Sequence, residues 1–132
     1  MRLIEIQILN QKNMTTKAIA KQLVALCRKG QWETAQKKLY ARNAMCIEAE
    51  AMPGSSRETK GLKAIIAKGR NFSAMMEKLH SLKVSEPVVA DKAFACTMSI
   101  DMTMKGQGRM KMTELCVYEV KRGKIVSEQF YY

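Results

Sequence analysis

Apolar residues recur at steps of three and four along much of the first half of the chain, a spacing that predicts helices. A first helix, capped by Thr15 or Thr16, is expected to run to about Lys29. A shorter helix over about 31–40 and a longer one over about 60–79 are expected to follow. Three helices are therefore predicted.

Strands are predicted mainly in the second half, where apolar and polar residues alternate. Short glycine-containing turns join the last three strands as hairpins, so this part of the sheet is antiparallel. One further strand is expected before the longest helix. The expected strands cover about 44–50, 82–90, 93–104, 109–121 and 124–132. The pattern predicts a single α+β domain in which three helices pack on a curled antiparallel sheet.

The hairpin around Gly106-Gln107-Gly108 can form in two registers. A two-residue turn would pair Lys105 with Gly108 and mix apolar with polar side chains on each face. A three-residue turn would pair Lys105 with Arg109 and separate them, and we expect this second register. Its apolar face carries Cys96, Met98, Ile100, Met102, Met104, Met110, Met112, Glu114, Cys116, Tyr118 and Val120, and its polar face carries Thr97, Ser99, Asp101, Thr103, Lys111 and Thr113.

Glu114 is the only carboxylate on this apolar face. Burial raises the pKa of a carboxyl group, which is one way to make a proton-transfer group. Continuing the alternation through the last hairpin places Tyr131 opposite Glu114 and Gln129 opposite Cys116. Both are expected as hydrogen-bond neighbours of the acid. The alternative is that Glu114 only satisfies a hydroxyl or backbone group in the core.

The opposite, outer face of the last two strands would carry several large apolar side chains. They are Leu115, Val117, Phe130 and Tyr132. A monomer seldom exposes so much contiguous apolar surface. A homodimer formed sheet to sheet is therefore expected.

The chain carries a formal net charge of +11, as many nucleic-acid-binding proteins do. Its basic residues, however, are spread along the whole length. Neither an aromatic–glycine RNA-binding signature nor a helix-turn-helix spacing is present. A solvated basic surface is therefore expected and nucleic acid is not, although weak attraction to anionic partners stays open.

Four cysteines occur singly and form no C-x-x-C pair, so neither a metal site nor a redox motif is predicted. They are expected as buried, reduced thiols of a cytoplasmic protein. No run of about 18 apolar residues predicts a membrane span. Residues 1–13 lack the features of a signal peptide. They are an extra strand, a stretch upstream of the natural start or an artificial addition, and the domain is expected over 14–132.

Two early segments, Gln22-Leu-Val-Ala-Leu-Cys-Arg-Lys-Gly-Gln-Trp-Glu33 and Leu39-Tyr-Ala-Arg-Asn-Ala-Met-Cys-Ile-Glu48, and the ending from Met112 to Tyr131 resemble the SnoaL-like family. This family belongs to the nuclear transport factor 2-like superfamily, as does ketosteroid isomerase. The resemblance covers about 15–132 and implies a cystatin-like, cone-shaped sheet around a long helix, with a pocket at its open end. It implies no cofactor. The fold hosts isomerases, cyclases and non-catalytic binding domains, so it does not fix the reaction.

The resemblance also implies catalytic positions. Matching the Leu39-Tyr40 segment onto its family equivalent puts Glu48 at the position of the isomerase base, whereas Leu23 stands where the isomerase has an oxyanion-binding tyrosine. Glu48 would then abstract a proton, while neutral Glu114 and Tyr131, which the hairpin register and not the resemblance places here, would donate hydrogen bonds to the developing oxyanion. The alternative for Glu48 is an exposed acid at the end of a strand.

His80, the single histidine, is expected to close the third helix. There it would either cap the helix or turn into the pocket mouth and shuttle a proton. Residues expected to line the ligand pocket, or else to form ordinary core, are Leu23, Tyr40, Phe72, Met76, Met98, Met112, Cys116, Tyr118 and Gln129. Two functions stay open: a pocket for a small apolar molecule with acid–base chemistry of the isomerase or cyclase type, and a non-catalytic binding or dimerisation domain.

Overall fold

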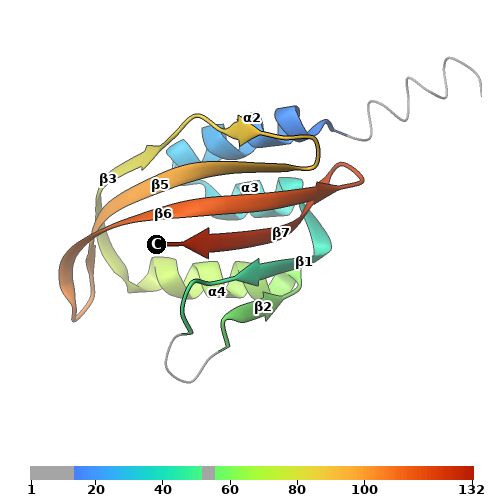
Figure 1. Cartoon of the computed structure of the whole chain (residues 1–132). Helices are drawn as coiled ribbons and strands as arrows, with labels where there is room; N and C mark the ends of the chain where they lie inside the picture. Colours follow the sequence, from blue (N-terminus) through green and yellow to red (C-terminus); the bar gives the residue numbers. More distant parts are fainter. Residues whose placement is uncertain (1–13, 52–55) are drawn as a thin grey trace, which may run out of the picture.

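The computed structural model describes residues 14–51 and 56–132, which form three helices and one curled sheet (Figure 1). The helices are α2 (Thr16–Arg28), α3 (Trp32–Leu39) and α4 (Leu62–Met75). The strands are β1 (Tyr40–Ile47), β2 (Glu58–Lys60), β3 (Met76–Val84), β4 (Val88–Val89), β5 (Ala93–Met104), β6 (Gly108–Lys121) and β7 (Lys124–Tyr131). The predicted α+β class is confirmed, and the alternatives for 1–13 lie outside the described residues.

The strands follow one another across the sheet in the order β2–β1–β7–β6–β5–β3, and β4 pairs with β5. β1 runs parallel to β7, and the other pairs are antiparallel. The helices lie against one face of the sheet, which we call the inner face (Figure 1). β7, the last strand in the sequence, therefore lies near the centre of the sheet, between β1 and β6.

α2 is capped by Thr15, one of the two predicted caps, whose hydroxyl oxygen accepts a hydrogen bond from the backbone N–H of Ala18 at 3.1 Å. The helix presents one apolar stripe to the interior. The buried residues of that stripe are Ile19, Ala20, Leu23, Val24 and Cys27. They form a single core with Ile65 of α4 and the inner-face side chains of the sheet.

α4 is shorter than predicted, because it ends at Met75 and the chain continues directly into β3. β3 then pairs with β5 along its length. Pairing with a neighbouring strand outweighs the helical spacing of apolar residues that continues to Leu79. The prediction of helix over 76–79 was therefore wrong, and His80 lies within a strand.

The β5–β6 hairpin separates apolar from polar side chains as predicted, although its register differs from the expected one. Met104 pairs with Gly108, and the three residues between them form the turn. The expected pairing of Lys105 with Arg109 was wrong. The observed register nevertheless keeps the same residues on each face, because the two registers differ by an even number of positions. Gly106 in this turn adopts a left-handed φ of 75°.

A β-bulge in the last hairpin reverses the faces of β7. Glu119 pairs with Ser127, but the next residue, Val120, pairs with Ile125. Val126 is therefore an extra residue on β7. Beyond it, each side chain of β7 points to the face opposite to the one that a regular hairpin would give.

The bulge overturns the predicted neighbours of Glu114. Tyr131 pairs with Leu115, and Gln129 pairs with Val117. Directly paired residues share a face, and these pairs lie on the outer one. The predicted hydrogen-bonding roles of Tyr131 and Gln129 on the inner face were therefore wrong.

The bulge also changes the apolar outer surface. Phe130, predicted outside, packs against the core on the inner face. Tyr132, also predicted outside, lies near Glu48 and Glu114. Partial burial is the largest cause of its raised pKa, and the negative charges of these two acids raise it further. Of the four predicted outer residues, Leu115 and Val117 remain outside, and Tyr131 joins them.

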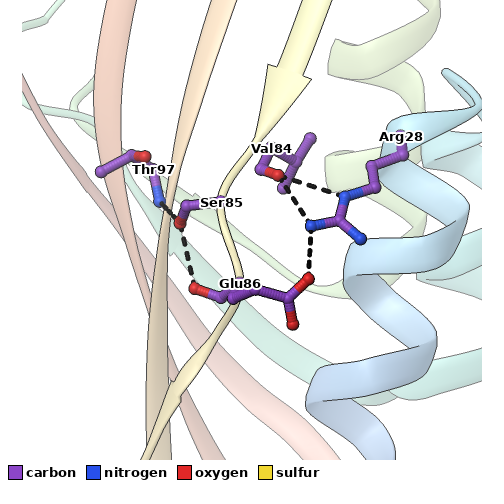
Figure 2. Close-up of polar contacts among 5 residues, drawn as sticks. All are labelled: Arg28, Val84, Ser85, Glu86 and Thr97. Carbon is purple, nitrogen blue, oxygen red and sulfur yellow. Dashed lines mark hydrogen bonds and ion pairs between the residues drawn. The ribbon is translucent and has the colours of Figure 1, made fainter.

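Arg28 links the end of α2 to the end of β3 by hydrogen bonds (Figure 2). Its Nε and Nη2 donate to the carbonyl oxygen of Val84 at 3.1 and 3.0 Å, and Nη2 also donates to Glu86 Oε1 at 2.9 Å. The hydroxyl of Ser85 extends this link to β5 by accepting the backbone N–H of Thr97 at 2.8 Å. A cation is also favoured at the C-terminal end of a helix by the helix dipole.

We expect Arg28→Ala to lower the free energy of unfolding by about 1 kcal/mol, because the carbonyl of Val84 loses its charged donors. Glu86→Gln is expected to cost less than about 0.5 kcal/mol, since the ion pair that it removes is exposed, with 84% of the Glu86 side chain in solvent. Urea denaturation of the two variants measures the difference. Equal losses would show that the ion pair, not the carbonyl contact, stabilises this junction.

Candidate functional site

Three glutamates from neighbouring strands meet on the inner face. Glu48 follows the end of β1, Glu114 lies on β6, and Glu128 lies on β7 between these strands. The three are close enough for their charges to act on one another. Lys68 of α4 adds a positive charge beside them. We call these four residues the inner acid cluster.

Glu48 is held at both its side chain and its backbone. Its Oε1 accepts a hydrogen bond from Lys68 Nζ at 2.6 Å, and the side chains of Glu48 and Lys68 are 21% and 38% exposed. Its backbone N–H donates to the carbonyl of Arg57 at 2.8 Å, and Arg57 Nε donates to the carbonyl of Glu48 at 3.0 Å. The Glu48 carboxylate is therefore fixed in place and still in contact with solvent.

Glu114 is half-buried, and its pKa is raised from an ordinary 4.5 to about 7. Burial is the largest cause, followed by the negative charges of Glu48 and Glu128. The thiol of Cys116, 3.9 Å from Glu114 Oε1, opposes the shift by donating to the carboxylate. The predicted inward orientation and raised pKa are both found. Near neutral pH, the protonated and ionised forms of Glu114 are therefore both populated.

Glu128 is the most buried member of the cluster, at 4% exposed. Its Oε2 accepts a hydrogen bond from the hydroxyl of Tyr40. Burial raises the pKa of Glu128 to about 7, although hydrogen bonds from Tyr40 and Cys46 act in the opposite direction. Burial and the charge of Glu128 also hold the pKa of Tyr40 well above its usual range. The Tyr40 hydroxyl is therefore a constant donor to Glu128 at neutral pH.

Sequence reasoning missed Glu128, because regular alternation places it on the outer face. A signal was present in the spacing of Ile125 and Phe130, both apolar and five positions apart. Residues separated by an odd number cannot share a face of a regular strand. Burying both requires an irregularity between them, and Val126 provides it.

Apart from Gln129, which lies on the outer face, the residues predicted to line a pocket divide into two groups on the inner side. Leu23, Tyr40, Met98, Cys116 and Tyr118 are buried in the core, where Tyr118 stacks on Phe94 with ring centroids 4.7 Å apart. Phe72, Met76 and Met112 are only partly buried. This second group is the part of the predicted lining that solvent can reach.

His80 lies on β3, away from the inner acid cluster. Its Nε2 is 2.7 Å from Thr103 Oγ1 on the polar outer face. The neighbouring Asp101 is held by Arg109, whose Nε and Nη2 donate to its two carboxylate oxygens at 3.0 and 2.8 Å. The predictions that His80 caps a helix or shuttles protons at a pocket mouth were therefore wrong.

Two surface depressions lie outside the inner acid cluster. The larger, of about 710 Å³, lies between the first turn of α2 and the β4–β5 and β6–β7 turns. The smaller, of about 220 Å³, lies beside Val88, Val89 and Val117. Neither contains a member of the cluster. The candidate site is therefore defined by the side chains of the inner acid cluster, at the end of the inner face that is in contact with solvent.

The four cysteines, Cys27, Cys46, Cys96 and Cys116, are buried and free, as predicted. Among the described residues, no three histidine, cysteine, aspartate or glutamate side chains are arranged to hold a metal ion. Within 14–51 and 56–132, no helix is long and apolar enough to cross a membrane.

Comparisons with known proteins agree with this architecture. A structure from Mesorhizobium loti, described as a SnoaL-like polyketide cyclase, is 32% identical with a TM-score of 0.83, over 90% of this chain and all (100%) of that one. A structure from Bacillus subtilis, described as an isomerase, is 19% identical with a TM-score of 0.67, over 88% of this chain and 84% of the other. A protein from Catenulispora acidiphila with a ketosteroid isomerase-like fold, in complex with trimethylamine, is 18% identical with a TM-score of 0.67, over 89% and 87% of the two chains.

The fold is thus that of the cystatin-like, nuclear transport factor 2-like proteins, as the sequence resemblance implied. A model of the SnoaL-like domain family matches residues 14–132. The chain belongs to the SnoaL-like domain family. No curated protein matches it significantly.

We expect the free energy of unfolding to fall as the pH rises from roughly 5 to 8. Glu114 and Glu128 bind protons more tightly in the folded state, where their pKa is about 7, than in the unfolded state, where it is near 4.5. Their stabilising contribution is therefore complete below the unfolded pKa and is lost as the pH rises through the folded pKa.

Glu128→Gln is expected to reduce this decline by about 1–3 kcal/mol, because a neutral amide replaces the buried acid and can still accept from Tyr40. Chemical denaturation at pH 5 and pH 8 measures the effect. Glu119→Gln, an exposed change on β6, serves as the control. Equal stability of the native chain at both pH values would contradict the raised pKa of these acids.

Proposed function

We propose that the chain binds a small, largely apolar carbonyl compound at the inner acid cluster, and that Glu114 exchanges a proton with it. The observation that carries the proposal is a half-buried carboxyl group with a pKa of about 7 on an apolar face. A group with this pKa both accepts and donates protons effectively near neutral pH. The proposal uses no cofactor.

The names given to two similar structures support this class of reaction. The Mesorhizobium loti protein is described as a polyketide cyclase and the Bacillus subtilis protein as an isomerase. Aldol-type cyclisation and isomerisation of a ketone both begin when a base removes a proton from a carbon beside a carbonyl group. A carboxylate in contact with both solvent and apolar side chains suits that first step.

Glu114 is proposed as the base in place of Glu48, the residue that the family resemblance implied. The carboxylate of Glu48 is engaged by Lys68 at 2.6 Å, and its charge is the larger of the two that raise the pKa of Glu114. Glu48 therefore tunes Glu114 in this proposal. Glu48 remains the alternative base, because its side chain is 21% exposed at the same end of the inner face.

The apolar part of the ligand is proposed to contact partly buried side chains beside the cluster. Phe72 of α4, Met112 of β6 and Phe130 of β7 all pack at the edge of the core without being fully covered. Such side chains favour an apolar molecule, because contact with it removes their remaining surface from water. Met112 also adapts to different shapes, since its side chain is flexible.

Glu114→Gln is expected to slow the exchange of carbon-bound protons in an enolisable cyclic ketone, such as 2-tetralone, by about 100-fold or more. Proton NMR in deuterated water follows the exchange. Glu48→Gln is expected to move the inflection of the pH–rate profile to lower pH, because removing a negative charge lowers the pKa of Glu114. The exposed Glu119→Gln is expected to leave the rate unchanged.

The same measurement separates the alternatives. Loss of exchange in Glu48→Gln but not in Glu114→Gln would make Glu48 the base. Ketone binding without exchange by the native chain would favour the second function, a non-catalytic binding domain of the same fold.

We also propose that two copies of the chain pair through the outer face around Leu115. Leu115 and Tyr131, which pair directly across β6 and β7, are 42% and 45% exposed. Val88 on β4 pairs with Ala95, which pairs in turn with Val117, so Val88 adds a residue that is 77% exposed to the same face. Apolar surface of this extent is commonly covered by a partner.

Leu115→Lys is expected to convert a dimer into a monomer, because it places a charge at the centre of the proposed interface. Analytical ultracentrifugation of the native chain and the variant measures their masses. Ala67→Lys, on the exposed side of α4, is the matched control and is expected to stay dimeric. A native chain that sediments as a monomer at high concentration would contradict this interface.

A further inference from the structure

Removal of a proton beside a carbonyl group leaves negative charge on the carbonyl oxygen, and a catalyst needs a donor positioned for it. Tyr131, the tyrosine predicted for this role, and two other candidate positions are unsuitable. Tyr131 faces outward, and the hydroxyl of Tyr40 is already donated to Glu128. Leu23, at the position that the resemblance aligns with the isomerase's oxyanion-binding tyrosine, is apolar and 1% exposed. The negatively charged carbonyl oxygen therefore requires another donor in the site.

We propose that Lys68 is a catalytic residue that donates a hydrogen bond to this negatively charged oxygen. The ligand of the cluster is then a carbonyl compound able to form an enolate. This inference rests on the proposed function and names the substrate class and the second reacting group. Lys68 Nζ lies 2.6 Å from Glu48 Oε1, while 38% of its side chain remains exposed. An ammonium group has three N–H donors, and the contact with Glu48 uses one of them.

The position of Lys68 fits this role. It projects from α4, which packs against β1 beside Glu48. Its partner Glu48 lies 3.7 Å from the thiol of Cys46, and Cys46 pairs with the inward-facing Glu128, so Lys68 lies over the inner face of the sheet. Glu48 is close to both Lys68 and Glu114, so a carbonyl compound beside Glu48 can present its oxygen to Lys68 and its adjacent carbon to Glu114.

The charges and electrons of the step balance. The C–H bond breaks, and its proton forms an O–H bond with the ionised Glu114. The electron pair of the broken bond forms the carbon–carbon double bond of the enolate, and the carbonyl π pair moves onto oxygen beside Lys68. Glu114 loses its charge as the oxygen gains one. The net charge of the site is unchanged, while repulsion between Glu114 and Glu48 is relieved.

Tyr132 is the competing donor. Its side chain is 68% exposed, and the charges of Glu48 and Glu114 act on it. Its phenol has a single donor, the O–H group, and carries no positive charge. Lys68 is therefore the stronger candidate, and Tyr132→Phe belongs in the test.

Phenols of graded acidity serve as stable probes, because a bound phenolate resembles an enolate in shape and charge. Absorbance measures the fraction ionised when each phenol binds. The native chain is expected to bind phenolates and lower the apparent pKa of the phenol. Lys68→Met is expected to weaken phenolate binding and slow ketone exchange by about 100-fold, while Lys68→Arg retains most of both.

Matched variants isolate the charge of Lys68. Lys63→Met removes an exposed lysine from the same helix and is expected to leave both readouts unchanged. Lys68→Met leaves Glu48 unpaired and can perturb folding. The double variant that carries both Glu48→Gln and Lys68→Met is therefore compared with Glu48→Gln alone. Circular dichroism confirms that each variant is folded.

The outcomes separate this inference from the proposed function. Exchange that depends on Glu114 but not on Lys68 would overturn the inference and leave the proposed function intact. Loss of phenolate binding in Tyr132→Phe but not in Lys68→Met would assign the donor role to Tyr132 and also overturn it. Absence of exchange in the native chain would reject the proposed function, whereas phenolate binding that requires Lys68 would still support an anion-binding lysine.

Discussion

One extra residue, Val126, decides which side chains of β7 reach the interior. Because β7 lies between β1 and β6, its inward residues stand in the middle of the inner face. The bulge turns Glu128 and Phe130 inward and sends Tyr131 outward. Without it, the inner face would hold two acids instead of three, and the Tyr40 hydroxyl would have no carboxylate partner there. The electrostatics of the site therefore depend on a single backbone irregularity.

Burial and charge act very differently on glutamates in different parts of this fold. Glu33 on α3 is partly exposed, with 38% of its side chain in solvent, and is bound by Arg70 and Lys37, which hold its pKa at about 2. Glu114 is half-buried, faces two other carboxylates, and has a pKa of about 7. Lys68 pairs directly with Glu48, and no ion pair to Glu114 is found within 14–51 and 56–132. The same side chain is thus an anion at neutral pH in one place and a group that titrates near neutral pH in the other.

The sequence was sufficient for most of the fold and for part of the site. Hydrophobic alternation assigned the two faces of β5 and β6 and so placed Glu114 correctly, because an even register error leaves the faces unchanged. The same alternation failed for β7, where an odd shift exchanged them. It failed again at His80, because the apolar spacing of α4 continues into β3 and only pairing with β5 ends the helix. Both errors concern long-range pairing, which a local pattern does not encode.

The position of Lys68, the cation of this site, follows from the contacts that anchor α4. Two residues beyond Lys68, Arg70 donates to both carboxylate oxygens of Glu33 on α3, at 2.6 and 3.1 Å. At its other side, α4 packs on β1, which carries the chain into Glu48. The helix that bears the cation is thus tied to a neighbouring helix and to the strand that leads to the nearest anion. A lysine side chain is long and flexible. Because the helix is attached on both sides, Lys68 nevertheless has a defined position beside the acids. The apolar Leu23 on α2 can then serve the core alone, because the charged function lies on a different helix.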